Sequence, residues 1–576
     1  MKKIILSVTL LLALTVAFGQ KAKPEPKPKP EPKEKPEPKP KPEPKPKPAK
    51  VVKGEEPIQM SKPFAEPENW TKLLQMSNGN TLLFEMTNGD GMKVTVFNEK
   101  HIAAPVKPLV LKTVIKKMQY TDVLGIYEIG GQAVVFIQQF EKPNPQLIRV
   151  IIEPKAGKLV SEDMIGELPE LTTGDGYAMA FGKVDAPRFD VVKDNTSENY
   201  TVVIYNSFAE ETNKRIEVIG FDKTHKQTFR AFYNCPADYK YLRYLNVYNY
   251  GGNFTYLAVY GYNTSKSGGD DSRIYVARIK LGNPQFKSIE LTYHDDFEYT
   301  RCEMSFNKKT ELLNFILYTS VYDKKHKNTV RCFFQPVHPD GFRLDSIFDV
   351  PFTKVNEYAK SKLGYKKDYL PTVMDVYLDD DGNYHALLQR ADLVTSYPVN
   401  TPVYHLNLDD WGYEVFDNTG TEISGTLFNV HYDYDGLNAM EGGVNFRYME
   451  AKKGYKPADR TLAVGKAKHW YKHMDMLYSS KANIVFMNDK WDNKELPEGK
   501  KGDPVKGMGG VTAFVYHIQP DGTFKRDYIF GKPRDKGNVK FCNFYASSYD
   551  PIKNIYATIM TDEGQDKKTY LVWLRL

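Results

Sequence analysis

Long apolar segments are absent from this chain beyond residue 18, and cysteine and tryptophan are scarce, with four and five residues in 576. No Cys-x-x-Cys pair occurs, which excludes a zinc ribbon and a thioredoxin-type redox motif. The sequence also contains no Gly-x-Ser-x-Gly, His-Glu-x-x-His, Walker or Ser-x-Asp-x-Gly-x-x-Trp motif. The usual sequence signatures of serine hydrolases, zinc proteases, P-loop NTPases and sialidases are therefore missing.

The N-terminus has the pattern of a secretory signal peptide. Two lysines precede an apolar run at 4–18, which ends in a small-x-small cleavage pattern before Gln20. A run of about 15 residues is shorter than the roughly 20 that a spanning helix needs, so a cleaved peptide at 1–19 is favoured over a retained anchor. We therefore expect an exported bacterial protein, in the periplasm or on the outer cell surface, with no transmembrane helix in the mature chain.

Residues 20–50 form a linker with nothing to bury. Pro alternates with Lys or Glu through 21–50, which holds 12 of the 36 prolines and no apolar side chain larger than Ala or Pro. Such a segment is disordered and extended, with polyproline II character, and at about 3.1 Å per residue it spans roughly 90 Å. Its composition resembles the Pro-Glu and Pro-Lys stalk of TonB, and the resemblance implies a periplasmic spacer. A peptide ligand for a partner is the alternative.

The positive charge of the chain lies in its N-terminal segments. The net charge is +7, but the linker contains eleven Lys against five Glu, and the signal peptide adds two more lysines. The remaining residues, 51–576, therefore carry a net charge of about −1, and their charge gives no reason to expect nucleic-acid binding. The linker itself could contact an anionic surface.

The composition of 51–576 favours β structure. Tyr and Phe number 39 and 31, and amphipathic helical windows are rare. Short helical turns are expected only at 354–362 and 466–477.

The same region contains a repeat. A turn residue, usually Asn, precedes a short apolar run that predicts a nearly fully buried strand, and a second, alternating strand follows. The runs begin at Asn80, Gln132, Asn199, Asn253, Asn314, Asn383, Asn483 and Asn554. Tight turns are expected at these positions because Asn tolerates left-handed backbone conformations.

Eight such inner strands predict an all-β fold, a β-propeller of eight blades, with seven or nine left open. The long gap between Asn383 and Asn483 leaves room for an insertion around 430–480. Because the chain ends on a strand, we expect the last blade to take its outer strand from 57–60. A pair of β-sandwiches is the alternative fold.

The four cysteines are expected to be buried thiols. Cys302 and Cys332 are predicted on the first and third strands of one blade, about two strand spacings of 4.8 Å apart, which is too far for a disulfide. Cys302 and Cys542 each precede the Asn of their repeat by twelve residues, so they are predicted to be equivalent.

Two clusters are candidate catalytic or binding sites. Asp295, Asp296 and Glu298, with Arg301 close by in the sequence, combine paired carboxylates with a guanidinium, a combination that suits glycoside or phosphoester chemistry. A solvated ion-pair loop is the alternative. Asp409-Asp410-Trp411 is interpreted as a turn with an acidic patch beside an aromatic ring.

Metal sites are suggested by spacing alone. His469 and His473, at i and i+4, with Asp475 after them, could ligate zinc, although no third ligand is evident. The acidic segments 379–383 and 433–436, the latter with Glu441 nearby, resemble calcium loops in composition but not in spacing. No metal or other cofactor is predicted with a complete set of ligands.

Two functions follow. The first is a secreted, non-catalytic binding or scaffold module for an envelope protein or glycan, held away from its attachment point by the linker. The second is a secreted hydrolase or lyase acting on polysaccharide, with carboxylates at the propeller axis. The missing motifs and the aromatic content favour the first, and the second, an enzyme, stays open.

Overall fold

The computed structural model divides the chain into two units, Met1–Glu55 and Glu56–Leu576. All described residues belong to the second unit. They are 57–67, 70–87, 91–105, 107–114, 121–139, 144–175, 178, 184–194, 196–263, 272–291, 300–321, 329–396, 403–438, 474–479, 482–493, 502–505, 508–519, 521–564 and 566–576. No helix within these ranges is long and apolar enough to cross a bilayer. The predicted signal peptide, the linker and most of the predicted insertion lie outside them.

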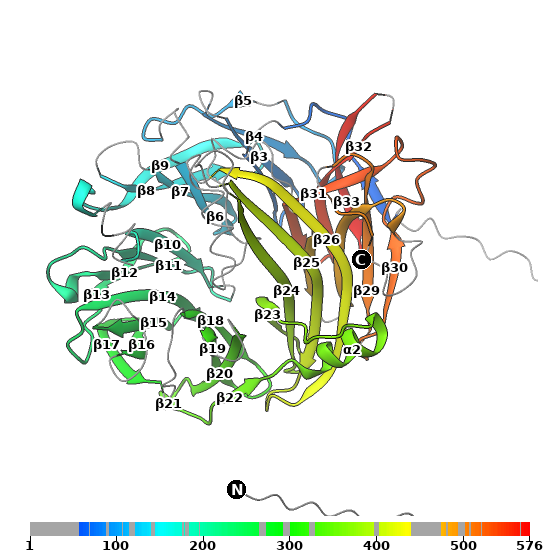
Figure 1. Ribbon diagram of the computed structural model, residues 1–576. Coiled ribbons are helices and arrows are strands. Elements are labelled where there is room, and N and C mark those ends of the chain that lie inside the picture. Colours follow the sequence, from blue (N-terminus) through cyan, green and yellow to red (C-terminus); the bar gives the residue numbers. More distant parts are fainter. Residues whose placement is uncertain are drawn as a thin grey trace, which may run out of the picture. The chain divides into compact units, whose positions relative to one another are not determined.

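Eight antiparallel sheets arranged in a ring make up this unit (Figure 1), which confirms the eight-bladed β-propeller. The sheets of blades 1 to 4 follow one another along the chain. Blade 1 comprises β2 (Trp70–Gln75), β3 (Thr81–Thr87), β4 (Gly91–Phe97) and β5 (Lys107–Pro108). Blade 2 comprises β6 (Thr121–Ile129), β7 (Gln132–Gln139), β8 (Gln146–Glu153) and β9 (Lys158–Glu167). Blade 3 comprises β10 (Arg188–Lys193), β11 (Tyr200–Tyr205), β12 (Ile216–Phe221) and β13 (Gln227–Phe232), with the short helix η2 (Thr212–Lys214) before β12. Blade 4 comprises β14 (Tyr241–Tyr250), β15 (Phe254–Tyr262), β16 (Ser272–Lys280) and β17 (Asn283–Glu290).

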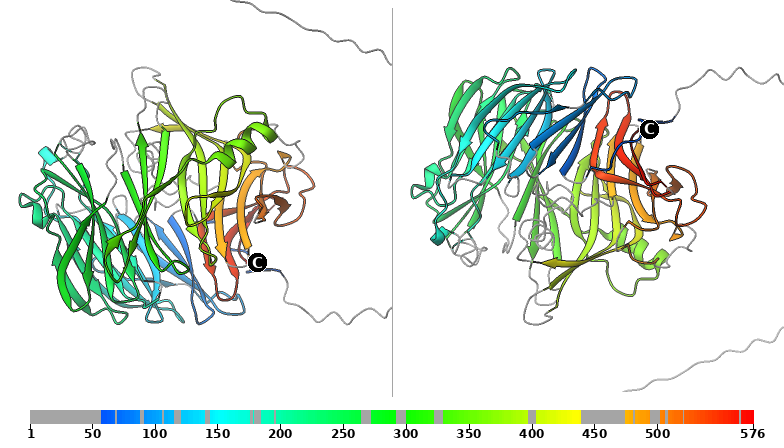
Figure 2. Two further views of the ribbon diagram at one scale, coloured as in Figure 1. Left: turned by 90° about the horizontal axis from the view of Figure 1, so that it is seen from below. Right: turned by 90° about the horizontal axis from the view of Figure 1, so that it is seen from above.

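Blades 5 to 8 complete the ring, and Figure 2 shows them from two further directions. Blade 5 comprises β18 (Thr300–Asn307), β19 (Leu312–Val321), β20 (Thr329–His338), β21 (Arg343–Leu344) and β22 (Phe348–Val350). Helix α2 (Thr353–Leu363) follows, and then blade 6 comprises β23 (Thr372–Leu378), β24 (Tyr384–Ser396), β25 (Val403–Phe416) and β26 (Glu422–Asn438). Blade 7 comprises β27 (Met474–Ser479), β28 (Ala482–Lys490), β29 (Val511–Ile518) and β30 (Phe524–Tyr528). Blade 8 comprises β31 (Lys540–Asp550), β32 (Ile555–Asp562), β33 (Lys568–Arg575) and β1 (Ile58–Met60).

The ring closes as predicted from the sequence. The three residues of β1 pair antiparallel with β33, with Ile58 opposite Leu574 and Met60 opposite Val572. The N-terminal strand is thus the outermost strand of the last blade. This pairing leaves the final sheet with four strands, like most of the others.

A hydrophobic cluster fills each of the eight interfaces between neighbouring blades. The cluster between blades 8 and 1, for example, contains Trp573 from β33 and Leu83 from β3. Both faces of the second and third strands therefore meet apolar neighbours, which explains why these strands have continuous apolar sequences rather than alternating ones.

The Asn-initiated runs are the second strands of the blades, so their description as inner strands was wrong. Each pairs with a preceding strand nearer the axis, as β11 does with β10. The left-handed residue of the turn is also usually the one before the Asn, or before Gln132 in blade 2. It is Gly79, Gly131, Glu198, Gly252 or Gly382 in five of these turns, and only Asn554 is itself left-handed.

Bulges interrupt four of the eight inner strands. The register shifts at 123–125 in β6, 244–246 in β14, 373–375 in β23 and 543–547 in β31. The inner strands β2, β10, β18 and β27 pair without a shift. Bulged and regular inner strands therefore alternate around the ring.

The helix and cysteine predictions had mixed outcomes. Helix α2 confirms the turn expected at 354–362. The C-terminal part of the helix expected at 466–477 is instead strand β27, which begins at Met474. Cys302 and Cys332 lie on the first and third strands of blade 5, and Cys542 occupies the first strand of blade 8. All four cysteines are free thiols, and Cys235 is only half-buried.

Candidate functional site

The candidate catalytic cluster at 295–301 falls largely outside the described residues. Asp295, Asp296 and Glu298 all do, and Arg301 is described only by its backbone, at the start of β18 opposite Tyr318. The predictions built on these residues stay predictions.

The zinc prediction also depends mainly on residues outside the described ranges. His469 and His473 lie outside the described ranges, whereas Asp475 is on β27. Its carboxylate accepts hydrogen bonds from the hydroxyls of Ser547, at 2.8 Å, and Tyr556, at 2.7 Å. Asp475 therefore links the first strand of blade 7 to blade 8. No group of three metal-ligating side chains occurs within the part of the chain that the structure describes.

The acidic segment at 379–383 is a hairpin turn between β23 and β24. The Asp379 carboxylate accepts hydrogen bonds from the backbone amide of Asn383, at 2.7 Å, and contacts the His385 ring, at 3.0 Å. Gly382 has a φ of 85°. The Asp379 carboxylate, which lies at the centre of the turn, thus has hydrogen-bond partners within the protein. The other such segment, 433–436, is part of strand β26, and Glu441 lies outside the described residues.

Asp409-Asp410-Trp411 is not a turn, which corrects the sequence interpretation. The three residues lie within β25, where Asp409 pairs with Arg390 and Trp411 with Gln389, leaving Asp410 as a bulge. Asp410 is fully buried and Trp411 nearly so. The carboxylate of Asp410 accepts a hydrogen bond from the Tyr365 hydroxyl, and its backbone oxygen accepts one from Tyr369, at 2.7 Å. This segment is therefore not an exposed acidic patch beside an accessible aromatic ring.

A hollow lies between blades 3 and 4, at the end of the sheets where the β10–β11 and β14–β15 turns meet. Its cavity volume is about 20 Å³, which is room for about one water molecule. Its walls combine hydroxyl, amide and aromatic side chains. They are Asp194, Asn199, Tyr200, Thr201, Phe221, Thr228, Phe229, Asn249, Asn253, Phe254, Thr255 and Leu281, with Gly220 and Gly252.

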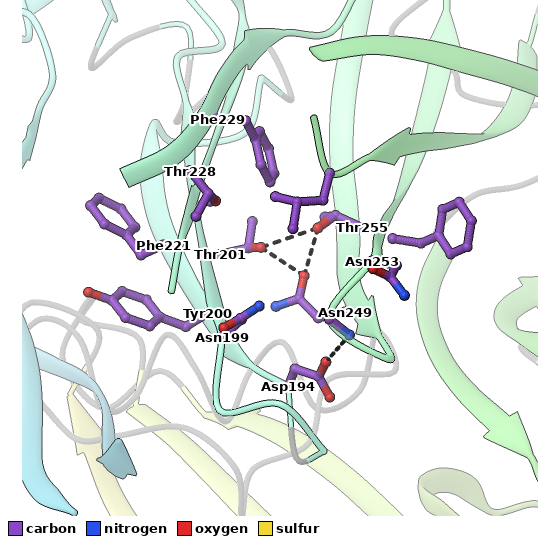
Figure 3. A pocket seen from close by; sticks show the side chains of 14 residues that line it. Asp194, Asn199, Tyr200, Thr201, Phe221, Thr228, Phe229, Asn249, Asn253 and Thr255 are labelled. Carbon is purple, nitrogen blue, oxygen red and sulfur yellow. Dashed lines mark hydrogen bonds between the residues drawn. The ribbon is translucent and has the colours of Figure 1, made fainter. Parts of the chain in front are cut away.

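The back of the hollow is a closed hydrogen-bond network (Figure 3). The Asn249 side-chain oxygen accepts bonds from the hydroxyls of Thr201, at 2.7 Å, and Thr255, at 2.9 Å. The amide nitrogen of Asn249 donates to the backbone oxygen of Val192, at 2.9 Å. Because these three polar side chains are buried and bonded to one another, they form a fixed wall.

Asp194 joins the two turns that frame the hollow. One carboxylate oxygen accepts from the amide and hydroxyl of Thr196, at 2.9 and 2.8 Å. The other accepts from the Ser197 hydroxyl and from the Gly252 amide of blade 4, both at 2.7 Å. Burial alone would raise the pKa of Asp194, but these hydrogen bonds outweigh it and lower the pKa below its ordinary value. The carboxylate is therefore charged but fully satisfied.

A second network lies behind Tyr200, toward blade 2. The Tyr200 hydroxyl accepts a bond from Arg149, at 2.5 Å, and lies 3.2 Å from Nδ1 of His225. Arg149 also pairs with Asp163, at 3.2 Å. Burial raises the pKa of Tyr200 to about 12, although Arg149 opposes the shift. The phenol is therefore neutral at physiological pH.

The opposite end of blades 3 and 4 has a different character. Asp185 pairs with Arg243 at 2.9 Å and with Arg188 at 3.7 Å. The Arg188 guanidinium lies over the rings of Tyr205 and Tyr244, 5.4 Å from each centroid, and its side chain is 38% exposed. Arginine and tyrosine, with tryptophan, are enriched among the residues that contribute most to binding at protein interfaces.

Two residues of the hollow, Asn199 and Asn253, are turn residues of the repeat, and their local sequence does not indicate a site. Asp194 and Phe229 were missed, because only the side-by-side packing of two blades reveals that they share a wall.

No family model and no curated protein matches this chain. Solved structures with similarity to it include one from a study of two prolyl endopeptidases, at 8% identity and a TM-score of 0.37, covering 87% of this chain and 55% of the other. The chain thus spans about half the length of that protein. The polysaccharide lyase Uly1 matches at 11% identity and a TM-score of 0.34, over 79% and 90% of the two chains. The endo-arabinanase of Bacillus licheniformis matches at 14% and 0.22, over 50% and 100%. These values assign neither a family nor an activity.

Proposed function

We propose that this protein is an exported binding module of the cell envelope, which recognises a protein or a glycan without transforming it. The linker holds the propeller away from its attachment point. The observation that carries the proposal is the hollow between blades 3 and 4, whose polar wall is fixed by its own hydrogen bonds and whose lining includes half-buried Phe229 and Phe254. A rigid surface with placed polar groups and aromatic side chains is suited to contacting a larger partner.

The Arg188 cluster supports the same conclusion at the other end of blades 3 and 4. Asp185 and two tyrosine rings hold this guanidinium in place, and it remains partly accessible. A side chain that is already ordered loses less conformational entropy when a partner binds. The propeller therefore offers two prepared surfaces, one at each end of the same pair of blades.

The test is affinity capture from an envelope extract with the whole mature chain as bait, followed by identification of bound proteins and glycans. A peptide of residues 21–50 serves as the control, because it separates binding by the linker from binding by the propeller. We expect ligands that the peptide does not retain. Recovery of nothing beyond the peptide control would contradict the proposal, and cleavage of an added polysaccharide would favour the hydrolase or lyase instead.

The linker is proposed to supply reach and not stability. Deletion of 21–48 should leave the melting temperature within about 1 °C of the parent, because the described strands close the ring without this segment. Function in the cell should be impaired. A clearly lower melting temperature of the shortened chain would show that the segment is part of the folded structure.

A further inference from the structure

Arg215 is a half-buried cation that no carboxylate of the described residues neutralises. It directly precedes β12, at the end of blade 3 where β10 begins. Its guanidinium donates hydrogen bonds to the backbone oxygens of Ala209, at 3.0 Å, and Lys240, at 2.7 Å. Burial lowers the pKa of Arg215 from its ordinary value. The two carbonyls therefore fix the direction of the guanidinium without balancing its charge.

Tyrosine rings connect Arg215 to two further arginines. Arg215 interacts electrostatically with Tyr205 and Tyr262. The Arg188 guanidinium lies 5.4 Å from the ring centroid of Tyr205, and that of Arg243 lies 5.6 Å from the ring centroid of Tyr262. Burial raises the pKa of both tyrosines, so their hydroxyls are neutral at physiological pH. The rings order the arginines but leave the positive charge of Arg215 in place.

Lys240 adds a positive group at the exposed side of this cluster. Its ammonium lies 5.2 Å from the ring centroid of Tyr241. The half-buried Tyr241 ring stacks on Tyr262, with the two centroids 5.1 Å apart. The lysine side chain itself is exposed, so a partner can reach it without any change in the fold.

The acids at this end lie in ion pairs or on exposed loops. Asp185 contacts the Arg188 and Arg243 guanidinium groups, and Glu211 pairs with a neighbouring lysine at 2.6 Å. The exposed acids on the flanking loops are Glu210 and Asp238. Among the described residues, none of these carboxylates lies within ion-pair distance of Arg215.

A carboxylate from outside the chain would supply the missing charge. A partly buried cation without a counter-charge is costly, and an anion that binds it removes part of that cost. No nitrogen of Arg215 is both buried and unbonded, so its remaining N–H groups reach solvent. A guanidinium presents such donors in a planar fork that matches a carboxylate. The tyrosines around it favour a protein over a charged polysaccharide, because tyrosine and arginine together are typical of protein interfaces.

We propose that this end of blades 3 and 4 binds an acidic segment of a partner protein, with one carboxylate on Arg215 and a second near Lys240. This inference rests on the proposed function and names the partner chemistry of one of its two surfaces.

The probes are labelled peptides of about 12 residues, each with about four Asp or Glu residues, and matched peptides with Asn or Gln in their place. Fluorescence anisotropy measures their affinity for the mature full-length chain at low and at physiological salt. At least one acidic peptide should bind at least tenfold more tightly than its amide counterpart, and its affinity should fall as salt rises. Equal affinity of acidic and amide peptides throughout would overturn the proposal.

Two substitutions locate the binding. Arg215→Gln should weaken the bound acidic peptide at least tenfold. Lys240→Glu should weaken it by a similar factor, and it keeps the proposal testable if Arg215→Gln unfolds, because Lys240 is exposed. The melting temperature of each variant is measured alongside.

The controls make the same kinds of change elsewhere in blade 3. Arg230→Gln removes a guanidinium on β13 that already pairs with Glu217 at 2.6 Å. Lys223→Glu reverses an exposed charge in the turn between β12 and β13, at the opposite end of the blade. Both should leave peptide affinity within twofold. The cationic linker is present in every variant, so its own attraction for acidic peptides cancels in the comparison.

The outcomes separate this inference from the broader function. If K240E and K223E bind the acidic peptides equally well, the surface is wrong. If an oligogalacturonate of similar charge binds in an Arg215-dependent way and no peptide does, the partner class is wrong. In both cases the binding function stands if affinity capture recovers a ligand that the linker peptide does not retain. If capture recovers nothing, the proposed function fails as well.

Discussion

Two buried acids, Asp194 and Glu414, each join separate parts of the propeller, and their surroundings differ in the number of donors. Asp194 is 3% exposed and accepts four hydrogen bonds from Thr196, Ser197 and Gly252. Glu414, on β25, is fully buried and accepts a bond from the amide of Val355 in α2, at 2.9 Å. Hydrogen-bond donors keep Asp194 charged, whereas Glu414 has too few donors to offset its burial.

A second carboxylate, that of Glu422, increases the difference between the surroundings of Glu414 and those of Asp194. Glu422 accepts bonds from the amide of Thr353, at 2.7 Å, and from its hydroxyl, so both glutamates serve the N-terminus of α2. The residue at the N-cap position, Phe352, provides no side-chain cap. Burial and the neighbouring Glu422 raise the pKa of Glu414 well above its ordinary value.

The comparison shows that burial alone does not fix the charge of an acid. Burial opposes ionisation at both sites, and the hydrogen-bond donors decide the result. The two acids should therefore influence stability in opposite directions with pH. Asp194 contributes above its unfolded pKa of 3.8, and this contribution is lost as the pH falls. Glu414 contributes most below 4.5, and its contribution is lost as the pH rises toward its folded pKa.

Separating α2 from blade 6 should have the largest effect on stability, because it breaks the contacts of Glu414 and Glu422 with the N-terminus of the helix. A Cβ at Gly425, on β26, would overlap with the backbone of Lys354 and Val355. Gly425→Val should therefore lower the free energy of unfolding by about 4 kcal/mol, measured by denaturant titration. Gly509→Ala is the control, since nothing lies within 4 Å of a Cβ there, and it should be nearly neutral. Equal stability of the two variants would show that α2 does not dock closely.

Removing Asp194, the acid that accepts four hydrogen bonds, should have the next largest effect on stability. Asp194→Ala leaves its donors, including the Gly252 amide, without an acceptor, and should cost about 3 kcal/mol. Asp521 is the matched control, because it accepts bonds from Thr523 alone in an exposed turn. Asp521→Ala should change stability far less. A comparable loss in both variants would contradict the role of Asp194 in linking two blades.

Replacing Glu414, the acid with few hydrogen-bond donors, should change mainly how the free energy of unfolding depends on pH. Glu414→Gln keeps the shape and the bond from Val355 but cannot ionise. Between pH 6 and 8, stability of the parent should fall with pH, and the variant should remove up to about 1.4 kcal/mol per pH unit of that slope, since one proton is involved. Glu357→Gln, on the exposed side of α2, is the control and should keep the parental slope. The measurement is chemical unfolding across the pH range; identical slopes for E414Q and the parent would mean that Glu414 is already ionised.

Local patterns were enough to predict the ring. The eight turn-led runs, the C-terminal strand and the partner strand at 57–60 are each encoded in a few consecutive residues, and the structure confirms all three. The assignment of Asp409-Asp410-Trp411 to a turn was wrong, because consecutive acids usually mark exposed turns, whereas here Tyr365 and Tyr369, from the segment that follows α2, hydrogen-bond to Asp410.

The site depends on contacts that sequence spacing does not reveal. Asp194 and Gly252 are 58 residues apart, and Glu414 and Val355 are 59 apart. These contacts appear only when elements distant in the sequence are packed side by side.

The alternation of bulged and regular inner strands makes two blades, not one, the smallest unit that restores the backbone pattern. A bulge increases local twist and bends its strand. Neighbouring blades therefore meet at an interface between unlike inner strands at every position of the ring. If two consecutive blades were removed or added, bulged and regular inner strands would still alternate where the ring is rejoined. If one blade were removed or added, two bulged or two regular inner strands would become neighbours.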